Sequence, residues 1–247
     1  MEKIVIKENT YKSPFSRKYD WSIEWFKQNK PISKNPYAER ATNKELKLLN
    51  ALMSVDVIGL GQAFKLFGID RRKAGQMCKE NKLVRHYIYL NGKPQVIYTL
   101  GREGQKLLGL EPAYKDYWLE YSVEDILKRL TFYQFYRCLP KTTFTAAPQP
   151  FTANIINSDK HFNVYILKGN SRDIERLLTY NEYYSGRVFM ILESFDEVLP
   201  LMEIIVRSQV KIRFVLEQDI AYALAEQKSI FELFYYYDSE KKDFEIE

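Results

Sequence analysis

Apolar residues recur at helical spacing in three short segments between residues 42 and 81. Thr42, with Glu45 three residues later, is a capping-box signal, and leucines follow at every third position up to Leu52. Asp70 is a good N-cap for the third segment. The pattern predicts helices over about ten residues from 43, over residues 60–67 and over residues 71–81.

A hairpin pattern follows these helices. Residues 83–90 and 95–100 alternate between apolar and polar, and Asn91-Gly92 between them is a strong turn signal. A short helix is expected over residues 102–108, with Gly109 at its end. Three helices, a hairpin and a further helix form the order of a winged helix-turn-helix, in which the third helix can lie in a major groove and the hairpin is the wing.

The remainder of the chain alternates between helix and strand patterns. An aromatic connector over residues 111–121 leads to Ser122 and Asp125, a capping signal for a helix that extends to about residue 138. Strands are predicted over residues 142–147, 151–157, 161–168, 187–192 and 211–216, and helices over residues 171–184 and 195–206. The last residues fit a helix end followed by a hairpin. The predicted fold class is α/β (α+β), with a winged helix-turn-helix followed by an α/β domain whose later strands are joined by right-handed crossovers.

The distribution of charge along the chain changes at the same places as the pattern of apolar and polar positions. Residues 1–40 carry nine Lys/Arg against five Asp/Glu, residues 41–110 carry twelve against five, and residues 111–247 carry sixteen against twenty-two. A basic front and an acidic back predict a polyanion-binding segment joined to a unit of different function. We therefore predict an N-terminal arm (1–40), a DNA-binding winged helix (41–110) and an α/β domain for oligomerisation or partner binding (111–247).

The arm contains a short amphipathic stretch over residues 20–28. It places Trp21, Trp25 and Phe26 on one side, and exposed tryptophans are usually covered by another part of a protein. We expect the arm to cross the domain that follows it.

Long cationic side chains bind phosphates, and Arg and Gln also reach base edges. Such residues fall on the outer faces predicted for the third helix and on the hairpin. The predicted DNA-binding residues are Arg71, Arg72, Lys73, Gln76, Lys79, Lys82, Arg85, His86 and Lys93. The alternative is that this winged helix docks onto a protein, or acts as a spacer with a solvated basic face.

Composition excludes several other classes of function. No apolar run is long enough to cross a bilayer, and the charged N-terminus has no signal core, so a cytoplasmic protein without membrane contact is expected. Cys78 and Cys138 are far apart in the sequence, and the chain has two histidines. These few residues favour neither a metal site nor a disulfide framework. Neither GxGxxG nor GxxxxGK[ST] occurs, so no nucleotide cofactor is expected.

Residues 43–109 resemble the replication-relaxation family of plasmids and phages of Gram-positive bacteria. The resemblance is carried by KELKLLNAL, by DRRKAGQMCKENKLVRH and by the closing VIYTLGREGQKLLG. It implies that the C-terminal half resembles a restriction-endonuclease-like fold, with the order helix, three strands, helix, strand. The predicted elements from Ser122 to Leu192 have this order.

An active nuclease of that type would need an acid in the second core strand and an acid-x-Lys triplet in the third, which together hold a divalent metal. The second strand, PFTANIIN, contains no acid. The third ends in Lys168, but Ile166 stands two residues before it. The resemblance therefore implies a degenerate fold without catalytic residues or metal ligands.

The leading hypothesis is a non-catalytic, dimeric double-stranded-DNA-binding protein of a plasmid, phage or other mobile element, which acts in replication control or initiation, or in transcription regulation. The α/β domain would then supply oligomer contacts or recruit a protein partner. One alternative is a metal-dependent nuclease or nicking accessory with a rearranged site, for which Lys168, Glu175 and Glu193 are the candidates. Another is a structural component of a conjugation or phage assembly, with the arm and the tyrosines at 235–237 as protein interfaces.

Overall fold

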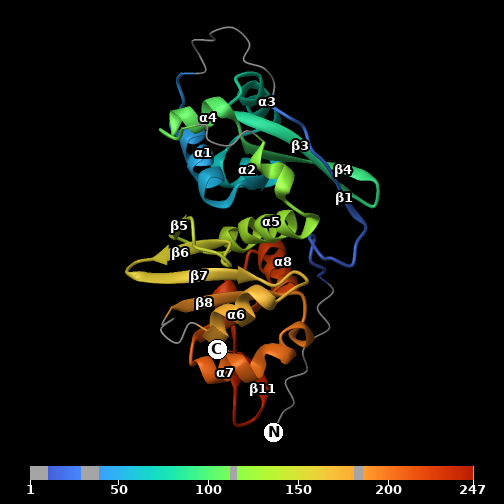
Figure 1. The fold of residues 1–247 in the computed structure, drawn as a ribbon, viewed down its shortest axis with the longest axis vertical. Coiled ribbons are helices and arrows are strands. Elements are labelled where there is room, and N and C mark those ends of the chain that lie inside the picture. The colour runs from blue at the N-terminus through green and yellow to red at the C-terminus, as the bar shows by residue number, and fades with distance from the viewer. Residues whose placement is uncertain (1–10, 29–38, 112–115, 181–185, 247) are drawn as a thin grey trace.

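The computed structural model describes residues 11–28, 39–111, 116–180 and 186–246 of the 247-residue chain. The protein is a mixed α+β structure with two sheets, one in each half of an elongated molecule (Figure 1). Helix α5 (Val123–Arg137) lies between the two halves. The N-terminal half here means the described residues up to 111, and the C-terminal half means those after α5, from 138 onward; residues 116–137 connect them.

The N-terminal half contains the helices and the hairpin that the sequence predicts. The helices are α1 (Asn43–Val55), α2 (Leu60–Phe67), α3 (Arg71–Lys79) and α4 (Arg102–Leu107). The hairpin joins β3 (Leu83–Leu90) to β4 (Lys93–Leu100). Asn91 and Gly92 have φ values of 49° and 74°, as a two-residue turn between twisted strands requires. The Thr42–Glu45 capping box is present at the start of α1.

Two short strands complete the sheet of this half. β2 (Val57–Gly59), which falls in the predicted connection, pairs with β4, and β1 (Trp21–Glu24) pairs with β3. Within the described residues the antiparallel order is β1-β3-β4-β2. The arm therefore adds an edge strand to the hairpin, and its Trp21 and Trp25 pack against the apolar cluster that contains Ile88 and Ile97 of the hairpin.

The C-terminal half is built on a larger sheet. Its strands are β5 (Thr143–Thr145), β6 (Ala153–Asn157), β7 (Lys160–Ile166), β8 (Arg187–Leu192), β9 (Lys211–Leu216), β10 (Tyr235–Asp238) and β11 (Asp243–Ile246). Among the described residues they lie in sequence order across the sheet, and β7, β8 and β9 are parallel while the flanking pairs are antiparallel. The accompanying helices are α6 (Arg172–Tyr180), α7 (Met202–Ser208) and α8 (Glu217–Glu226).

The predicted helix over residues 195–206 differs from the structure. Two 3-10 turns, Phe195–Glu197 and Leu199–Leu201, precede α7, which begins only at Met202. Pro200 lies at the start of the second turn. Because proline has no N–H and its ring is accepted only in a first helical turn, a regular helix cannot run through this position from residue 195.

Helix α5 packs against both halves. On one side Leu130 and Ile126 join an apolar cluster with Val57 and Ile97 of the small sheet. On the other side the ring of Phe135 lies 5.4 Å from that of Phe189 in β8. One hydrophobic core includes residues of α1, α5 and the large sheet, so the two halves share their apolar interior.

Tyr133 shows how tightly this contact is made. Its side chain is fully buried, and its hydroxyl donates a hydrogen bond to the Ala51 carbonyl oxygen of α1 (3.1 Å). From α2, Gln62 donates to the Leu130 carbonyl oxygen of α5 (2.7 Å). Buried polar groups that are paired in this way fix the orientation of the helices that carry them.

A shared core predicts that the two halves unfold together. Phe135→Ala removes a fully buried ring from the α5–sheet contact and should cost about 3–5 kcal/mol of unfolding free energy. All three tryptophans, Trp21, Trp25 and Trp118, lie in the arm or beside the hairpin, so their fluorescence reports on the N-terminal half. In urea titrations the substitution should lower the fluorescence and far-UV circular dichroism midpoints equally. Phe231→Ala, at a side chain that is 39% exposed, is the control. A fluorescence midpoint unchanged by Phe135→Ala would contradict the shared core.

Candidate nucleic-acid interface

Helix α3 turns its cationic side chains to solvent because its apolar positions are used for packing. Ala74 and Met77 are fully buried against the helices of the N-terminal half. Asp70 caps the helix by accepting from the Lys73 N–H (2.7 Å). Since the buried face is fixed in this way, four of the predicted side chains project from the opposite face: Arg71, Arg72, Gln76 and Lys79.

Arg85 of β3 extends this face. Its guanidinium lies over α3 at Gly75, where a Cβ would be 3.7 Å from Nη2. A hydrogen bond with Tyr87 raises the pKa of Arg85. Burial raises the pKa of Tyr98 to about 12, while the charges of Arg85 and Arg71 both lower it, so the two guanidiniums lie near the same phenol. We call the set Arg71, Arg72, Gln76, Lys79 and Arg85 the α3 basic surface.

Two other predicted residues lie at the margin of this surface. Lys73 is half-buried, and its Nζ lies 2.8 Å from Glu45 Oε1 of α1. Lys93 is exposed at the turn of the β3–β4 hairpin, at the end of the strands away from α3 (Figure 1). Gln76 donates to Glu80 Oε1 (2.8 Å), so this amide would have to exchange a partner in order to contact a ligand.

The prediction that Lys82 lies on an outer face is wrong. Its side chain is 2% exposed, with Nζ 2.7 Å from Glu80 Oε2 and 3.9 Å from Glu45 Oε1. Helix α3 ends at Lys79. The Lys82 N–H then donates a hydrogen bond to the Met77 carbonyl oxygen (2.9 Å), so the chain reverses direction at this point. This reversal directs Lys82 toward α1, where two carboxylates and the Arg40 carbonyl oxygen bind the ammonium.

His86 is also not on the surface of the hairpin, where the sequence pattern placed it. Its ring is fully buried between Trp25 of the arm (4.9 Å between centroids) and Trp118 (5.0 Å). Nδ1 accepts from the Phe26 N–H (3.0 Å), so Nε2 carries the proton and donates to Thr99 Oγ1 (2.8 Å). Burial lowers the pKa of His86 to about 3. The alternation of β3, with Arg85 outward, was a signal that its neighbour points inward.

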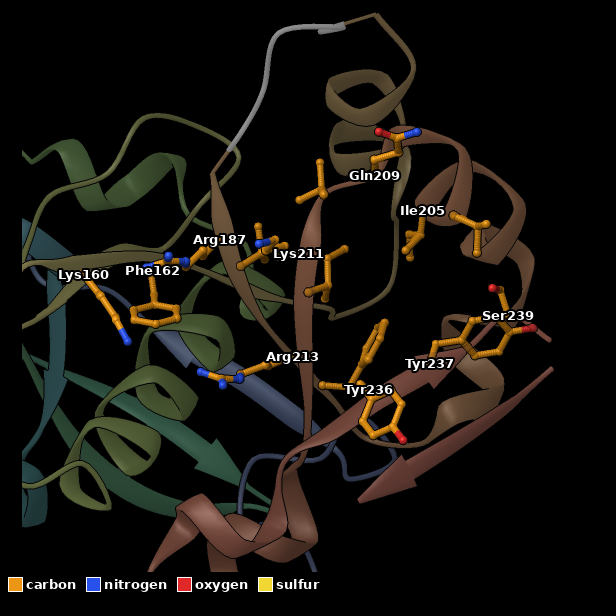
Figure 2. Close-up of a pocket in the computed structure, with 15 residues that line it drawn as sticks. Lys160, Phe162, Arg187, Ile205, Gln209, Lys211, Arg213, Tyr236, Tyr237 and Ser239 are labelled. Atoms are coloured by element: carbon orange, nitrogen blue, oxygen red, sulfur yellow. The ribbon is translucent and has the colours of Figure 1, made fainter. Parts of the chain in front are cut away.

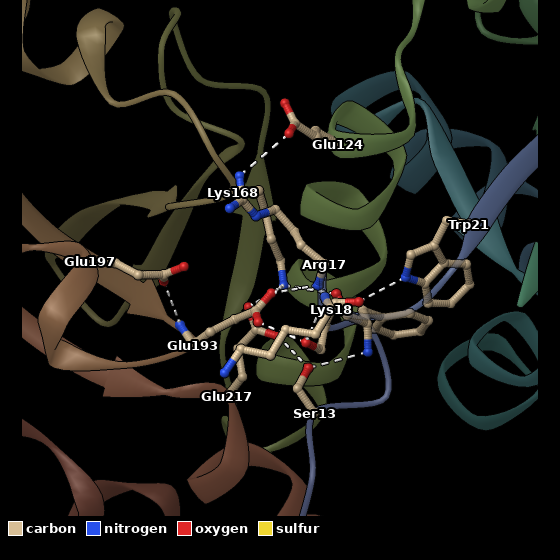
Figure 3. A network of polar contacts seen from close by, with 11 residues as sticks. Ser13, Arg17, Lys18, Trp21, Glu124, Lys168, Glu193, Glu197 and Glu217 are labelled. Atoms are coloured by element: carbon tan, nitrogen blue, oxygen red, sulfur yellow. Dashed lines mark hydrogen bonds and ion pairs between the residues drawn. The ribbon is translucent and has the colours of Figure 1, made fainter. Parts of the chain in front are cut away.

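A buried ion cluster occupies the carboxyl ends of the three parallel strands (Figure 3). Lys168 follows β7, Glu193 follows β8 and Glu217 follows β9. The Lys168 ammonium lies 2.7 Å from Glu193 Oε1 and 2.6 Å from Glu217 Oε1. We call these three residues the Lys168 cluster. The sequence had singled out Lys168 and Glu193, but it missed Glu217, and its third candidate, Glu175, is exposed on α6.

The arm covers the Lys168 cluster. Lys168 donates to the Phe15 carbonyl oxygen (2.8 Å), and Glu193 accepts from the Ser16 hydroxyl (2.7 Å) and the Arg17 N–H (2.8 Å). The Ser13 hydroxyl donates to Glu217. Because an ammonium has three N–H donors, these partners use all of them. The cluster therefore fastens the arm to the sheet and has no donor left for a phosphate.

The pKa values of the two carboxylates of the cluster are shifted in opposite directions. Burial raises the pKa of Glu193, but Lys168 and the arm's donors outweigh it and hold the pKa below its usual range. Burial also raises the pKa of Glu217, and there it outweighs the ion pair with Lys168. One lysine therefore pairs with one fully ionised carboxylate and with a second that binds its proton more tightly than usual.

The chain matches no protein-family model, and no curated protein or solved structure is significantly similar to it. Among the described residues, His, Cys, Asp and Glu side chains nowhere gather in a group of three or more that could hold a metal ion. No helix in the described ranges has both the length and the apolar character of a membrane span.

The buried His86 predicts an acid-sensitive N-terminal half. Because its folded-state pKa lies below the usual 6.5, the neutral ring's contribution is complete above pH 6.5 and is lost as the pH falls toward 3. The slope is at most about 1.4 kcal/mol per pH unit for one proton. His86→Gln should remove this part of the pH dependence in urea unfolding between pH 7.5 and 5.5, whereas His161→Gln, at the exposed histidine, should retain it. Equal pH dependence in the wild type and His86→Gln would contradict the assignment.

The Lys168 cluster predicts unequal stability losses when its two acids are replaced. Glu193→Gln removes the ionised partner and should cost about 1.5–3 kcal/mol at pH 7. Glu217→Gln removes an acid whose burial already opposes its ionisation, so its cost should be less than about 1 kcal/mol, since an amide oxygen still accepts from Lys168.

The sign of the pH dependence provides a second check on the cluster. The contribution of Glu193 is present above its unfolded-state pKa and is lost as the pH falls through its lowered pKa, whereas the cost of burying Glu217 grows as the pH rises through its usual range. The unfolding free energies of both variants, measured at pH 7 and pH 4.5, test these two opposite pH dependences. A Glu217→Gln variant less stable at pH 7 than Glu193→Gln would overturn these opposite pKa shifts.

Proposed function

We propose that this chain binds double-stranded DNA through a winged helix formed by α1, α2, α3 and the β3–β4 hairpin. The element order and the pairing of β2 with the hairpin support this assignment, since both are features of winged helices. The observation that carries the proposal is the α3 basic surface. Helix α3 contains no acidic residue, and Arg85 continues its cationic face across β3.

The proposed mode of binding places α3 in a major groove. Arg71, Arg72 and Lys79 would contact phosphates or guanine edges, which present two acceptors to a guanidinium. Gln76 would read an adenine after releasing Glu80. Lys93, at the tip of the hairpin, would contact a phosphate of the adjoining groove. Lys82 and His86 have no part in this contact because both are buried.

The biological role that we propose is control or initiation of replication, or transcription regulation, for a plasmid, phage or other mobile element in the cytoplasm. The resemblance of residues 43–109 supports this role. The elements from α5 onward support it less directly: α5, three strands, α6 and β8 follow one another in the order of a degenerate restriction-endonuclease-like fold. A dimer formed through the C-terminal half would present two α3 helices to half-sites about 34 Å apart.

Substitution of the α3 basic surface tests DNA binding directly. Arg71→Ala with Arg72→Ala should weaken binding to duplex DNA from the chain's own genetic element at least tenfold. It should also reduce the slope of log K against log salt by about two, because each lost phosphate contact removes about one unit. Fluorescence anisotropy at four salt concentrations between about 50 and 200 mM measures both quantities.

The matched control is Lys44→Ala with Lys47→Ala, which removes two exposed cations of α1 from the same half. This variant should bind within about threefold of the wild type, as expected for cations outside the contact surface. Equal weakening by both double variants would show that binding depends on net charge alone. Wild-type binding without salt dependence would contradict the proposal altogether.

A further inference from the structure

A second cationic site lies in the C-terminal half, at the amino ends of the parallel strands (Figure 2). Lys160, Arg187 and Lys211 are the first residues of β7, β8 and β9. The register places Phe162 beside Arg187, and Arg187 beside Lys211. Neighbouring strands lie about 4.8 Å apart, so these like charges lie close together, and like charges directly opposite one another destabilise a sheet. The Arg187 guanidinium also lies over the Phe162 ring (5.8 Å to the centroid).

These cations line a pocket of about 580 Å³, which we call the β7–β9 pocket. Its volume is in the range of small-molecule and nucleotide sites. Arg213 is a fourth cation in the lining, and no residue among the described ones that line the pocket is acidic. The segment after residue 110 has an excess of acidic residues, with twenty-two against sixteen basic ones. Four of those sixteen cations line this one pocket, so the pocket is a local positive site on an acidic half.

The pocket exists because two strands diverge. Among the described residues, β10 pairs with β9 at a single position, Tyr235 opposite Phe214. Beyond it the chain of β10 leaves β9, and Tyr236 and Tyr237 form the far wall of the resulting gap. Tyr236 is 40% exposed, with its hydroxyl donating to Glu245 of β11, so part of the side chain is accessible to a ligand.

Cations on one wall and phenol rings on the other match the chemistry of a nucleotide chain. Phosphates bind Lys and Arg, and bases stack on aromatic rings with little regard to sequence. An acidic peptide would use the cations but would have no use for the rings. Figure 1 places α5 and the large sheet between α3 and this end of the strands, so the pocket is separate from the α3 basic surface.

We propose that the β7–β9 pocket binds single-stranded nucleic acid, with phosphates at Arg187, Lys211 and Lys160 and a base against Tyr236. This goes beyond duplex binding by α3, and it does not depend on it. A chain with both sites would hold a duplex on one half and a separated strand on the other, as is needed where two strands are opened.

The test uses the full chain and a fluorescein-labelled thymidine decanucleotide, which cannot pair with itself. The wild type should bind it saturably. Arg187→Gln with Lys211→Gln should weaken binding at least tenfold and reduce the salt slope by about 1.4, or 0.7 for each phosphate contact. Lys141→Gln with Arg172→Gln, which removes two exposed cations outside the pocket, should bind within twofold of the wild type. Equal binding by the pocket variant and the wild type would overturn the proposal.

Two further variants separate binding in the pocket from binding elsewhere on the chain. Tyr236→Ala should weaken decanucleotide binding at least fivefold while Tyr236→Phe retains it, because stacking needs the ring and not the hydroxyl. Arg71→Ala with Arg72→Ala should leave decanucleotide binding unchanged even where duplex binding is lost, so failure of one proposal is distinguishable from failure of the other. Loss of decanucleotide binding in that α3 variant would overturn the pocket site. Displacement by a glutamate decapeptide as effective as by unlabelled decanucleotide would also overturn it.

Discussion

The arrangement of this protein depends on one helix that is apolar on two opposite sides. Ile126 and Leu130 of α5 pack against the small sheet. Phe132 and Phe135 of α5 belong to the core that is shared with the large sheet. A helix that buries most of its circumference packs against two neighbours, so it orders both of them at once. The basic and acidic halves are therefore held in one orientation, and the α3 basic surface keeps a fixed position relative to the β7–β9 pocket.

The arm also links the two halves, along the outside of the molecule. Phe15 and Ser16 fasten it to the Lys168 cluster, and a few residues later β1 pairs with the hairpin while Trp25 covers His86. Two buried polar centres, one in each half, thus receive hydrogen bonds from a single short segment. Each would leave polar groups unpaired if the arm detached, and buried unpaired groups are costly. Trp25 of the arm accordingly serves to cover a buried histidine.

The sequence predicted most elements because their signals are local. The Asn91-Gly92 turn, the Thr42 capping box and the apolar run of β8 each depend on a few adjacent residues, and each is present. The misplaced side chains depend on contacts with distant residues. Lys82 pairs with the nearby Glu80, but its burial also depends on Glu45 and on the Arg40 carbonyl oxygen, both far earlier in the chain. Glu217 joins Lys168 only because β9 lies two strands away from β7. Charge counting alone cannot distinguish a lysine that neutralises an internal acid from one that faces a ligand.

Hydrogen–deuterium exchange of the full chain with and without duplex DNA tests the central claim most directly, because it locates the contact without any substitution. The account predicts slower exchange at residues 71–79 and at the start of β3 when duplex is bound, with no change at β7, β8 and β9. Protection confined to the C-terminal half, with α3 exchanging at the same rate in both samples, would contradict it.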